Sequence, residues 1–236
     1  MMRLDRFLCE TGQGTRSEVK QLIRKGFVTV NGLQETAADR KLEEEADVVA
    51  VRGEVCLFQK FHYYLLHKPA GVITATRDQS QQTVVDLLAG EKVRNLFPVG
   101  RLDKDAEGLL LITDDGELAH KLLSPKKHVD KTYFVRTKLP LCQQDAKCLE
   151  AGVDIGDETL TLPARVEQIA DNEIKLIIQE GRFHQVKRML EAVGNEVIYL
   201  KRLSMGPLAL PKDLEKGSFR PLNREELLKL RQENLL

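Results

Sequence analysis

The sequence lacks the features that would indicate a membrane protein, a zinc protein or a disulfide framework. Its 236 residues include no tryptophan and four cysteines, and no two cysteines form a CxxC pair. No apolar run approaches the roughly 18 residues that a membrane helix needs. The first ten residues carry two arginines and two acidic side chains, where a signal peptide would be apolar. We therefore expect a cytoplasmic protein without a membrane partner.

Motifs for common cofactors and metals are missing as well. The chain contains neither GxxxxGK[ST] nor GxGxxG, and the lone GxG at residues 12–14 indicates a loop. Its five histidines never recur at a ligand spacing such as HxxxH. Asp114, Asp115 and Gly116 are typical of a turn that caps a helix, which is a more common use of such residues than metal binding. The sequence predicts no metal and no cofactor.

Charge is balanced overall but segregated along the chain. The 36 basic and 36 acidic residues give a net charge of zero. Residues 1–32 hold six basic and three acidic side chains, a net charge of +3, whereas residues 33–58 hold three basic and seven acidic side chains, a net charge of −4. Such segregation favours a basic patch on one face, although an ordinary solvated surface fits nearly as well.

Residues 15–32 predict a helix followed by a strand and a tight turn. Thr15 and Glu18 form a capping box, Gly26 ends the helix, and the strand at residues 27–30 turns at an Asn-Gly pair. Basic residues recur along the helix with i, i+4, i+8 spacing, at Arg16, Lys20 and Arg24. On spacing alone, a solvated helix face is the more common explanation of this stripe.

The order helix, helix, strand, Asn-Gly turn resembles the alpha-L RNA-binding domain of ribosomal proteins and RNA-modifying enzymes, over residues 2 to about 50. The resemblance implies that the two helices present basic side chains to a folded RNA, mostly to its phosphates. The residues concerned here are Arg3, Arg6, Arg16, Lys20, Arg24 and Lys25. We expect this domain to cover residues 1–59 and a second domain to cover residues 60–236.

From Tyr63 onwards the sequence alternates between short strands and turns. The predicted strands are residues 63–67, 109–112, 131–136, 164–170, 173–178 and 196–200, and the predicted helices are 83–89, 116–123, 182–193 and 227–230. Strands outnumber helices, and many are linked as hairpins. We therefore expect an α+β fold around a mostly antiparallel sheet.

The stretch from residue 97 to residue 116 carries the first candidate site residue. A tight turn at residues 100–103 places Asp103 between Arg101 and Lys104, and a short apolar run that predicts a buried strand follows it. A charged loop held against a buried strand is a rigid mount for a reactive group. Asp103 is therefore our candidate for that group.

Two other segments add basic and aromatic side chains. Arg182, Lys187 and Arg188 surround the start of a predicted helix, where cations and helix N-termini both attract phosphate. Lys131 and Tyr133 place an aromatic hydroxyl beside another cation at a strand start. Taken singly, Tyr133 is more often sheet packing, and the basic cluster is more often a solvated helix end.

Together these segments resemble the pseudouridine synthases, and among them the branch that acts on small-subunit ribosomal RNA, often called the RsuA family. The matching segments are residues 68–71 (KPAG), 100–103 with 108–113, 131–133 (KTY) and 181–189. Two positions depart from the family pattern. Ala106 stands where Thr or Ser is usual, and Phe183 stands where Tyr is common, with stacking as its role in either case.

The resemblance implies an α+β catalytic domain, with a mixed and mostly antiparallel sheet flanked by helices, that isomerises one uridine of 16S ribosomal RNA to pseudouridine. The uridine leaves its stack, its N1–C1′ bond is cleaved with the help of Asp103, and the uracil is rejoined through C5. Asp103 either attacks as a nucleophile or deprotonates the ribose, and both alternatives remain open. No cofactor is needed, and the reaction requires no second carboxylate, so Asp105 need not participate.

The remaining roles are implied residue by residue. Lys187 pairs with Asp103 and keeps it ionised, since a cation within about 4–6 Å favours a charged carboxylate. Tyr133 stacks on the uracil and handles the C5 proton. Arg101 fills the space that the base vacates. Arg182 and Arg188 contact the RNA.

Three other functions stay open at this point. A large-subunit ribosomal RNA target would keep the chemistry, and a non-catalytic ribosomal RNA-binding assembly factor would not need Asp103, Tyr133 and Lys187 together. A glycosidase would need a second matched carboxylate. We expect small-subunit ribosomal RNA as the partner, either naked or in a partly assembled subunit, and a monomeric protein.

Overall fold

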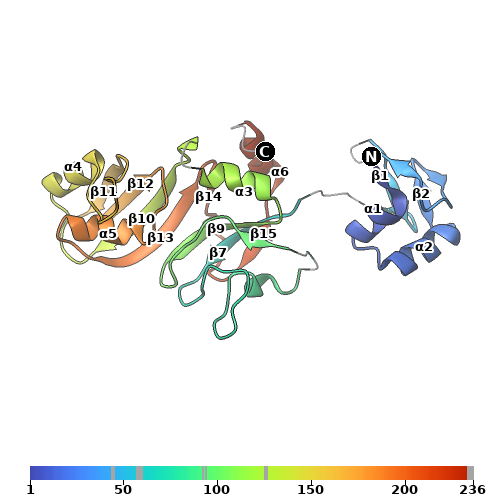
Figure 1. The fold of residues 1–236 in the computed structure, drawn as a ribbon, viewed down its shortest axis with the longest axis horizontal. Coiled ribbons are helices and arrows are strands. Elements are labelled where there is room, and N and C mark those ends of the chain that lie inside the picture. Colours follow the sequence, from blue (N-terminus) through green and yellow to red (C-terminus); the bar gives the residue numbers. More distant parts are fainter. Residues whose placement is uncertain (44–45, 57–60, 92, 94, 125–126, 233–236) are drawn as a thin grey trace. The chain divides into compact units, whose positions relative to one another are not determined.

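The computed structural model describes all residues except 44–45, 57–60, 92, 94, 125–126 and 233–236 (Figure 1). The chain divides into two compact units, residues 1–61 and residues 62–236. The domain boundary predicted between residues 59 and 60 lies outside the described residues. In the described part of the chain, no helix is long and apolar enough to cross a membrane.

The first unit combines two helices with short strands. Its elements are β1 (Met2–Arg3), α1 (Leu4–Glu10), α2 (Arg16–Arg24), β2 (Val28–Val30), β3 (Leu33–Gln34), β4 (Lys41–Leu42), β5 (Val49–Val51) and β6 (Glu54–Cys56). Four of the strands form a sheet in the order β3-β2-β5-β6. The β2–β3 hairpin turns at Asn31 and Gly32, with φ angles of 53° and 79°, as the Asn-Gly pair predicts.

Helix α2 begins and ends where the sequence predicts. The Thr15 hydroxyl accepts a hydrogen bond from the Glu18 amide, and the Glu18 carboxylate accepts one from the Thr15 amide at 2.7 Å. Val19 and Ile23 are fully buried against α1 and the small sheet. The opposite face of α2 is exposed, so its amphipathic pattern fixes which side chains can meet a partner.

The second unit is built on one large sheet. Its elements are β7 (Tyr63–Lys68), a 3-10 turn (Asp86–Leu88), β8 (Phe97–Pro98), β9 (Glu107–Thr113), α3 (Gly116–Leu123), β10 (Lys131–Thr137), α4 (Gln143–Ala151), β11 (Arg165–Ala170), β12 (Glu173–Ile178), α5 (Gln185–Ala192), β13 (Val197–Met205), β14 (Leu208–Ala209), β15 (Phe219–Pro221) and α6 (Arg224–Gln232). Among the described residues, nine strands pair in the order β11-β12-β10-β13-β9-β7-β15, with β14 beside β13 and β8 beside β9. The β13–β9 pair is parallel and the others are antiparallel, which confirms the predicted α+β fold with a mixed sheet.

Two buried clusters lie side by side on one face of this sheet. Leu66 of β7 and Leu110 of β9 pack against side chains from residues 72–96, which form the irregular segment between β7 and β9. Val135 of β10 packs instead in a cluster covered by α4 and α5, which lie together at one end of the sheet in Figure 1. The parallel β13–β9 junction is where the two halves of the sheet meet.

A row of paired residues crosses that junction. Lys68 lies opposite Gly108, Gly108 opposite Arg202, and Arg202 opposite Tyr133, on strands β7, β9, β13 and β10 in turn. Residues paired in this way face the same side of a sheet. The segment 100–106, called the Asp103 loop below, enters β9 at this row.

One predicted helix, residues 83–89, is shorter than expected. The structure has a single 3-10 turn there, Asp86–Leu88. Thr83 bridges to Ile73, and the Val84 amide donates to the Ile73 carbonyl at 3.0 Å. These extended pairings hold the first two residues of the predicted helix out of a helical conformation.

Three other elements differ from the prediction by three or more residues at one end. Helix α5 begins at Gln185 and not at residue 182, because His184 has a left-handed conformation with φ of 47°. Strand β13 continues to Met205, because it pairs with β10 along its length. Helix α6 begins at Arg224, after a reciprocal cap between Asn223 and Glu226.

Gly108 should be essential for the β13–β9 junction. A Cβ at this position would lie 2.2 Å from the Arg202 carbonyl oxygen and 2.5 Å from its amide nitrogen, and the φ of Gly108 is +111°. We expect Gly108→Ala to lower the free energy of unfolding of the second unit by about 4 kcal/mol or more in urea titrations. Gly217→Ala is the control, because φ is +82° there but no atom lies within 4 Å. It should lose only about 1–2 kcal/mol, and equal losses would contradict this explanation.

Candidate active site

The Asp103 loop rests on a buried ammonium group. Lys68 ends β7, is fully buried, and donates to three carbonyl oxygens, those of Ala106 at 2.8 Å, Pro69 at 3.0 Å and Lys104 at 3.3 Å. Burial lowers the pKa of Lys68 to about 8, because a charged ammonium loses its hydration there. Two of its acceptors belong to the loop, so the loop's backbone is fixed by this side chain.

Further bonds tie the loop to the segment after β7. The Thr74 hydroxyl donates to the Leu102 carbonyl at 2.7 Å and accepts from the Leu102 amide at 3.2 Å. The Gly71 amide donates to the Lys104 carbonyl at 2.7 Å. The main chain of the loop is therefore held by hydrogen bonds on both sides of Asp103.

The Asp103 carboxylate meets a nitrogen on each of its oxygens. Lys187 Nζ lies 3.3 Å from Oδ2, and His184 Nε2 lies 3.5 Å from Oδ1. The Asp103 side chain is 21% exposed, so it remains open to a ligand. The sequence predicted the pairing with Lys187, and the structure brings these two residues together. His184 was not among the predicted site residues.

Asp105 also belongs to this cluster. Its two carboxylate oxygens accept from Lys187 Nζ at 2.7 and 2.8 Å, closer than the contact between Lys187 and Asp103. The hydrogen bond from Lys187 lowers the pKa of Asp105. Burial opposes the charge of Lys187, but the bond to Asp105 and the charges of both carboxylates outweigh it and raise the Lys187 pKa. The ammonium therefore stays charged between two carboxylates at neutral pH.

Tyr133 and Arg101 flank the loop in different ways. Tyr133 is 7% exposed and shares a buried cluster with Leu102 and Ala106 of the loop and Met189 of α5. Arg101 is exposed and makes no hydrogen bond or ion pair with any other described residue. Tyr133 is therefore fixed in the wall of the site, and Arg101 is free to move toward a ligand.

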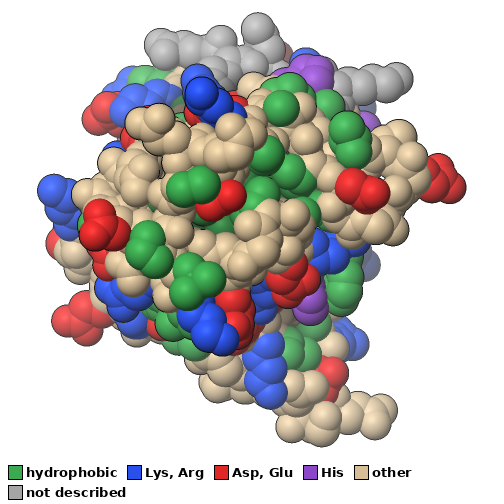
Figure 2. Space-filling model, turned by 90° about the vertical axis from the view of Figure 1, so that its left-hand side faces the viewer, with side chains coloured by type: hydrophobic (Ala, Val, Ile, Leu, Met, Phe, Trp, Pro, Cys, Tyr) green, Lys and Arg blue, Asp and Glu red, His purple; other side chains and the backbone are tan. Residues whose placement is uncertain are grey.

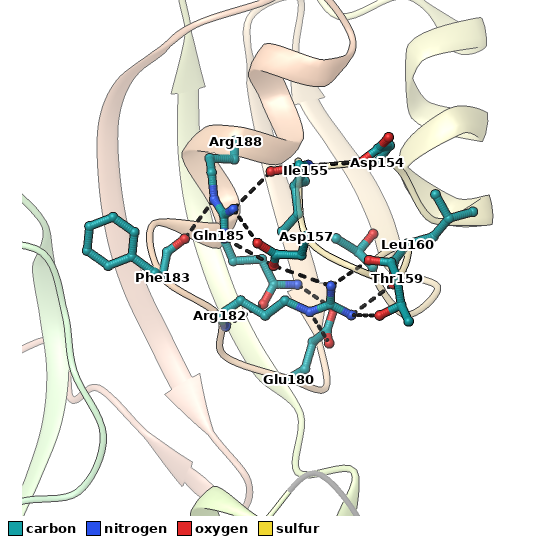
Figure 3. A network of polar contacts seen from close by, with 12 residues as sticks. Asp154, Ile155, Asp157, Thr159, Leu160, Glu180, Arg182, Phe183, Gln185 and Arg188 are labelled. Atoms are coloured by element: carbon teal, nitrogen blue, oxygen red, sulfur yellow. Dashed lines mark hydrogen bonds and ion pairs between the residues drawn. The ribbon is translucent and has the colours of Figure 1, made fainter.

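The two other arginines predicted at this site hold structure together. Arg188 donates to the Asp157 carboxylate at 2.7 Å and to the Ile155 carbonyl at 2.9 Å, and Arg182 pairs with Glu180 at 2.9 Å (Figure 3). On the face of the molecule that Figure 2 shows, basic and acidic side chains are likewise interspersed. A contact of Arg182 or Arg188 with RNA stays a prediction.

The predicted basic residues of the first unit fall into two groups. Arg3 pairs with Asp5 at 2.9 Å and Arg6 with Glu10 at 2.7 Å. The others are exposed and make no ion pair within the part of the chain that the structure describes; they are Arg16, Lys20, Arg24 and Lys25. The second group presents unneutralised charge along α2 and its end.

Sequence reasoning missed four residues of this site. Lys68 was assigned only to a turn, although residues 68–71 resemble the family, and Asp105 was given no role in the reaction. His184 has a signal in hindsight, because it directly follows the exposed aromatic residue before α5. Nothing in the sequence points to Asp157, because it is far along the chain from its partners Arg182 and Arg188. Among the described residues, no three His, Cys, Asp or Glu side chains gather as metal ligands would.

The buried ammonium predicts a measurable pH dependence. Between about pH 8 and pH 10.5 the folded chain has released the Lys68 proton while the unfolded chain still binds it, so Lys68 increases stability as pH rises. We expect the difference in unfolding free energy between wild type and Lys68→Met to change in favour of wild type by about 1–2 kcal/mol from pH 8 to pH 9.5. Lys131, whose pKa burial also lowers to about 8, is present in both proteins and cancels. A difference that is constant with pH would contradict the burial of a charged Lys68.

Comparison with known proteins places this geometry in a family. A family model described as RNA pseudouridylate synthase matches residues 62–192, and one described as S4 domain matches residues 2–48. The chain is 48% identical to an uncharacterised RNA pseudouridine synthase of Bacillus subtilis, YtzG, over 96% of this chain and 97% of that protein. It is 41% identical to ribosomal small subunit pseudouridine synthase A of Vibrio cholerae, over 96% of this chain and 98% of that protein.

A solved structure agrees with the sequence relatives. The crystal structure of a pseudouridylate synthase superposes with a TM-score of 0.67 at 36% identity, covering 98% of this chain and 100% of the other. Both resemblances that the sequence showed are thus confirmed, the one in the N-terminal unit and the one that includes Asp103. The chain belongs to the RNA pseudouridylate synthase family and carries an S4 domain before its catalytic domain.

Proposed function

We propose that this RNA pseudouridine synthase modifies one uridine of small-subunit ribosomal RNA and that Asp103 is the residue that reacts. The observation that carries the chemical part is the Asp103 carboxylate, held between Lys187 and His184 on a loop fixed by Lys68. The target is supported by relatives named ribosomal small subunit pseudouridine synthase A, which are 41% identical in Vibrio cholerae and 39% identical in Escherichia coli.

The reaction conserves every atom of the nucleotide. The N1–C1′ bond breaks, the uracil turns, a C5–C1′ bond forms, and the proton leaves C5 while N1 gains one. A carboxylate can begin this sequence either by attacking C1′ or by removing a ribose proton, and both routes require ionised Asp103. The ammonium of Lys187, 3.3 Å away, stabilises that charge.

Lys187 also limits the freedom of the carboxylate. Its ammonium is anchored to Asp105 at 2.7 Å, so it approaches Asp103 from a fixed direction. A catalytic group that is held in position before substrate binds needs no reorganisation in the transition state. Asp105 is thus a positioning residue for Lys187, without contact with the reacting atoms.

Tyr133 is suited to hold the extruded base, and Arg101 is suited to fill the space that the base leaves. A uridine that leaves its stack costs a few kcal/mol, which new contacts must offset. Tyr133 packs in one buried cluster with Leu102 and Ala106 of the Asp103 loop, and its ring would stack on the uracil once the extruded base enters the site. The exposed Arg101 side chain can enter the space that the base leaves.

The exposed cations of α2 supply sequence-independent attraction to phosphates. Arg16, Lys20 and Arg24 repeat along one face of the helix and make no ion pair with the described residues. Contacts of this kind bring an RNA to the protein without selecting the uridine. We expect the enzyme to work in the cytoplasm, where ribosomal subunits are assembled.

The decisive experiment maps pseudouridine in the small- and large-subunit ribosomal RNA of cells that lack this protein. The cells are complemented with wild type, Asp103→Asn or Asp105→Asn. We expect one small-subunit site to disappear, to return fully with wild type, and to stay absent with Asp103→Asn. Asp105→Asn is the matched control, two residues away on the same loop, and should restore the site with a reduced rate.

The other outcomes separate the alternatives. A missing large-subunit site would keep the chemistry and overturn the target. A site that Asp103→Asn restores would overturn the role of Asp103. If no ribosomal site is lost, the target proposal is wrong, and a role in subunit assembly or another RNA substrate has to be tested.

A further inference from the structure

A cleft of about 520 Å³, called the back cleft below, lies on the face of the large sheet that is turned away from Asp103. His67, Thr132 and Lys201 line it, and each directly precedes a member of the row of paired residues at the Asp103 loop. Successive side chains of a strand point to opposite faces of a sheet. The row faces the loop, so these three side chains face the other way. The sheet itself therefore separates the back cleft from the reacting carboxylate.

An irregularity in the sheet and a short crossing segment shape the back cleft. The pairing of β10 with β13 shifts after Thr132, and the consecutive residues Leu203 and Ser204 both line the cleft there. Residues 209–212 form another wall, which is held where the Leu210 amide donates to the Leu203 carbonyl at 2.7 Å. Leu203 and Leu210 are half-buried, so part of their apolar surface is open to a ligand.

The lining of the back cleft carries two cations without counterions. Neither Lys201 nor Lys212 makes an ion pair or a side-chain hydrogen bond with a described residue. The third lysine of the lining, Lys175, pairs with Glu167 at 3.3 Å. Among the described lining residues, three lysines and one glutamate give a net charge of +2. A phosphomonoester has a charge of about −1.5 to −2 at pH 7 and matches it.

His67 adds a hydrogen-bond acceptor that no described residue satisfies. It is 5% exposed, and its Nδ1 lies 2.7 Å from the Leu214 carbonyl oxygen. A carbonyl only accepts, so Nδ1 carries the proton. Burial lowers the pKa of His67, and the neutral ring leaves Nε2 with a lone pair. This Nε2 is buried without a partner among the described residues, and such a group needs a donor.

We propose that the back cleft binds a nucleotide, with Lys201 and Lys212 on its phosphate and His67 Nε2 accepting from a hydroxyl or amino group of the nucleoside. A nucleotide combines the three features that this lining fits, namely an anion, a ring with apolar faces and a hydrogen-bond donor. The volume lies in the range of about 300–1,000 Å³ that is typical of small-molecule sites. A free monophosphate and the 5′-phosphorylated end of an RNA present the same group.

The test is equilibrium binding to the full chain, measured by isothermal titration calorimetry. The probes are adenosine 5′-monophosphate, adenosine and inorganic phosphate. We expect the monophosphate to bind about 10-fold or more tightly than either of the others. Lys201→Gln and Lys212→Gln should each weaken its binding by about 10-fold, because a charged hydrogen bond is lost, and should leave adenosine unchanged. The control, Lys147→Gln, removes an exposed lysine of α4 on the other face of the sheet and should change nothing.

The contact with His67 has a different signature. In His67→Asn the amide nitrogen can replace Nδ1 as donor to the Leu214 carbonyl, but nothing replaces Nε2. We expect this variant to weaken the monophosphate and adenosine alike, by about 5-fold, since the lost bond belongs to the nucleoside. A loss confined to the monophosphate would overturn this part of the assignment. If the variant does not fold, the two lysine variants still decide the proposal.

A second comparison identifies the source of the nucleotide. The probe is a short RNA of unrelated sequence that carries either a 5′-phosphate or a 5′-hydroxyl group. If an RNA end is the ligand, the 5′-phosphorylated RNA binds more tightly than the monophosphate, and Lys201→Gln removes the gain that the 5′-phosphate gives. If a free nucleotide is the ligand, the monophosphate binds more tightly and the 5′-phosphate gives no gain. Both results support the back cleft.

Three outcomes would overturn the proposal. They are the absence of binding by the monophosphate and the 5′-phosphorylated RNA at millimolar concentration, binding that Lys201→Gln and Lys212→Gln leave unchanged, and an equal loss with Lys147→Gln. None of these variants alters Asp103, and no product is measured. The result is therefore independent of whether the proposed uridine target is correct.

Discussion

The burial of the Lys68 ammonium beneath the Asp103 loop is the interaction on which the rest of the site depends. Removing an ammonium group from water costs several kcal/mol unless acceptors surround it. Here three main-chain carbonyls do so, and two of them belong to the loop. If the loop moved, it would leave a buried charge with the Pro69 carbonyl as its remaining acceptor among these three. The row of paired residues through Gly108 and Arg202 brings Lys68 to this place, so the register of the sheet decides where the carboxylate stands.

The other side of the site is fixed independently by the segment before α5. Arg188 joins that segment to Asp157, and the strained His184 points its ring edge at Asp103. Lys187 then reaches across from α5 to both carboxylates of the loop. Two separately braced walls thus meet at one carboxylate. A site built in this way is organised before its substrate arrives, which is the condition under which charges contribute most to catalysis.

Local patterns were enough to predict much of the fold. The capping box of α2 and the apolar run of β9 are each formed by residues that are close together in the chain. Both elements lie where they were expected. The helix expected at residues 83–89 is reduced to a 3-10 turn at Asp86–Leu88, and Thr83 pairs instead with Ile73, a contact that the local sequence pattern does not show. Helix α5 was extended too far, because its apolar period continues through residues that the left-handed His184 excludes.

Site residues could be predicted from the sequence where the pattern that indicates them lies within one segment of the chain. Asp103 and Lys187 were proposed from a turn, a basic cluster and a family resemblance, and the structure brings them together. The roles of Asp105 and Lys68 in the site were not predicted. Their partners lie on other elements, and counting charges along the chain cannot show which residues will meet. The pairing of Asp157 with Arg188 joins residues from a loop and a helix, and neither segment contains a pattern that predicts it.

The most direct measurement is the structure of the Asp103→Asn protein bound to an RNA that contains the target uridine. We expect an extruded uridine whose C1′ lies within about 3.5 Å of the side chain at position 103, with the uracil against Tyr133. A uridine that stays stacked in the RNA, while position 103 faces solvent or a phosphate, would contradict it.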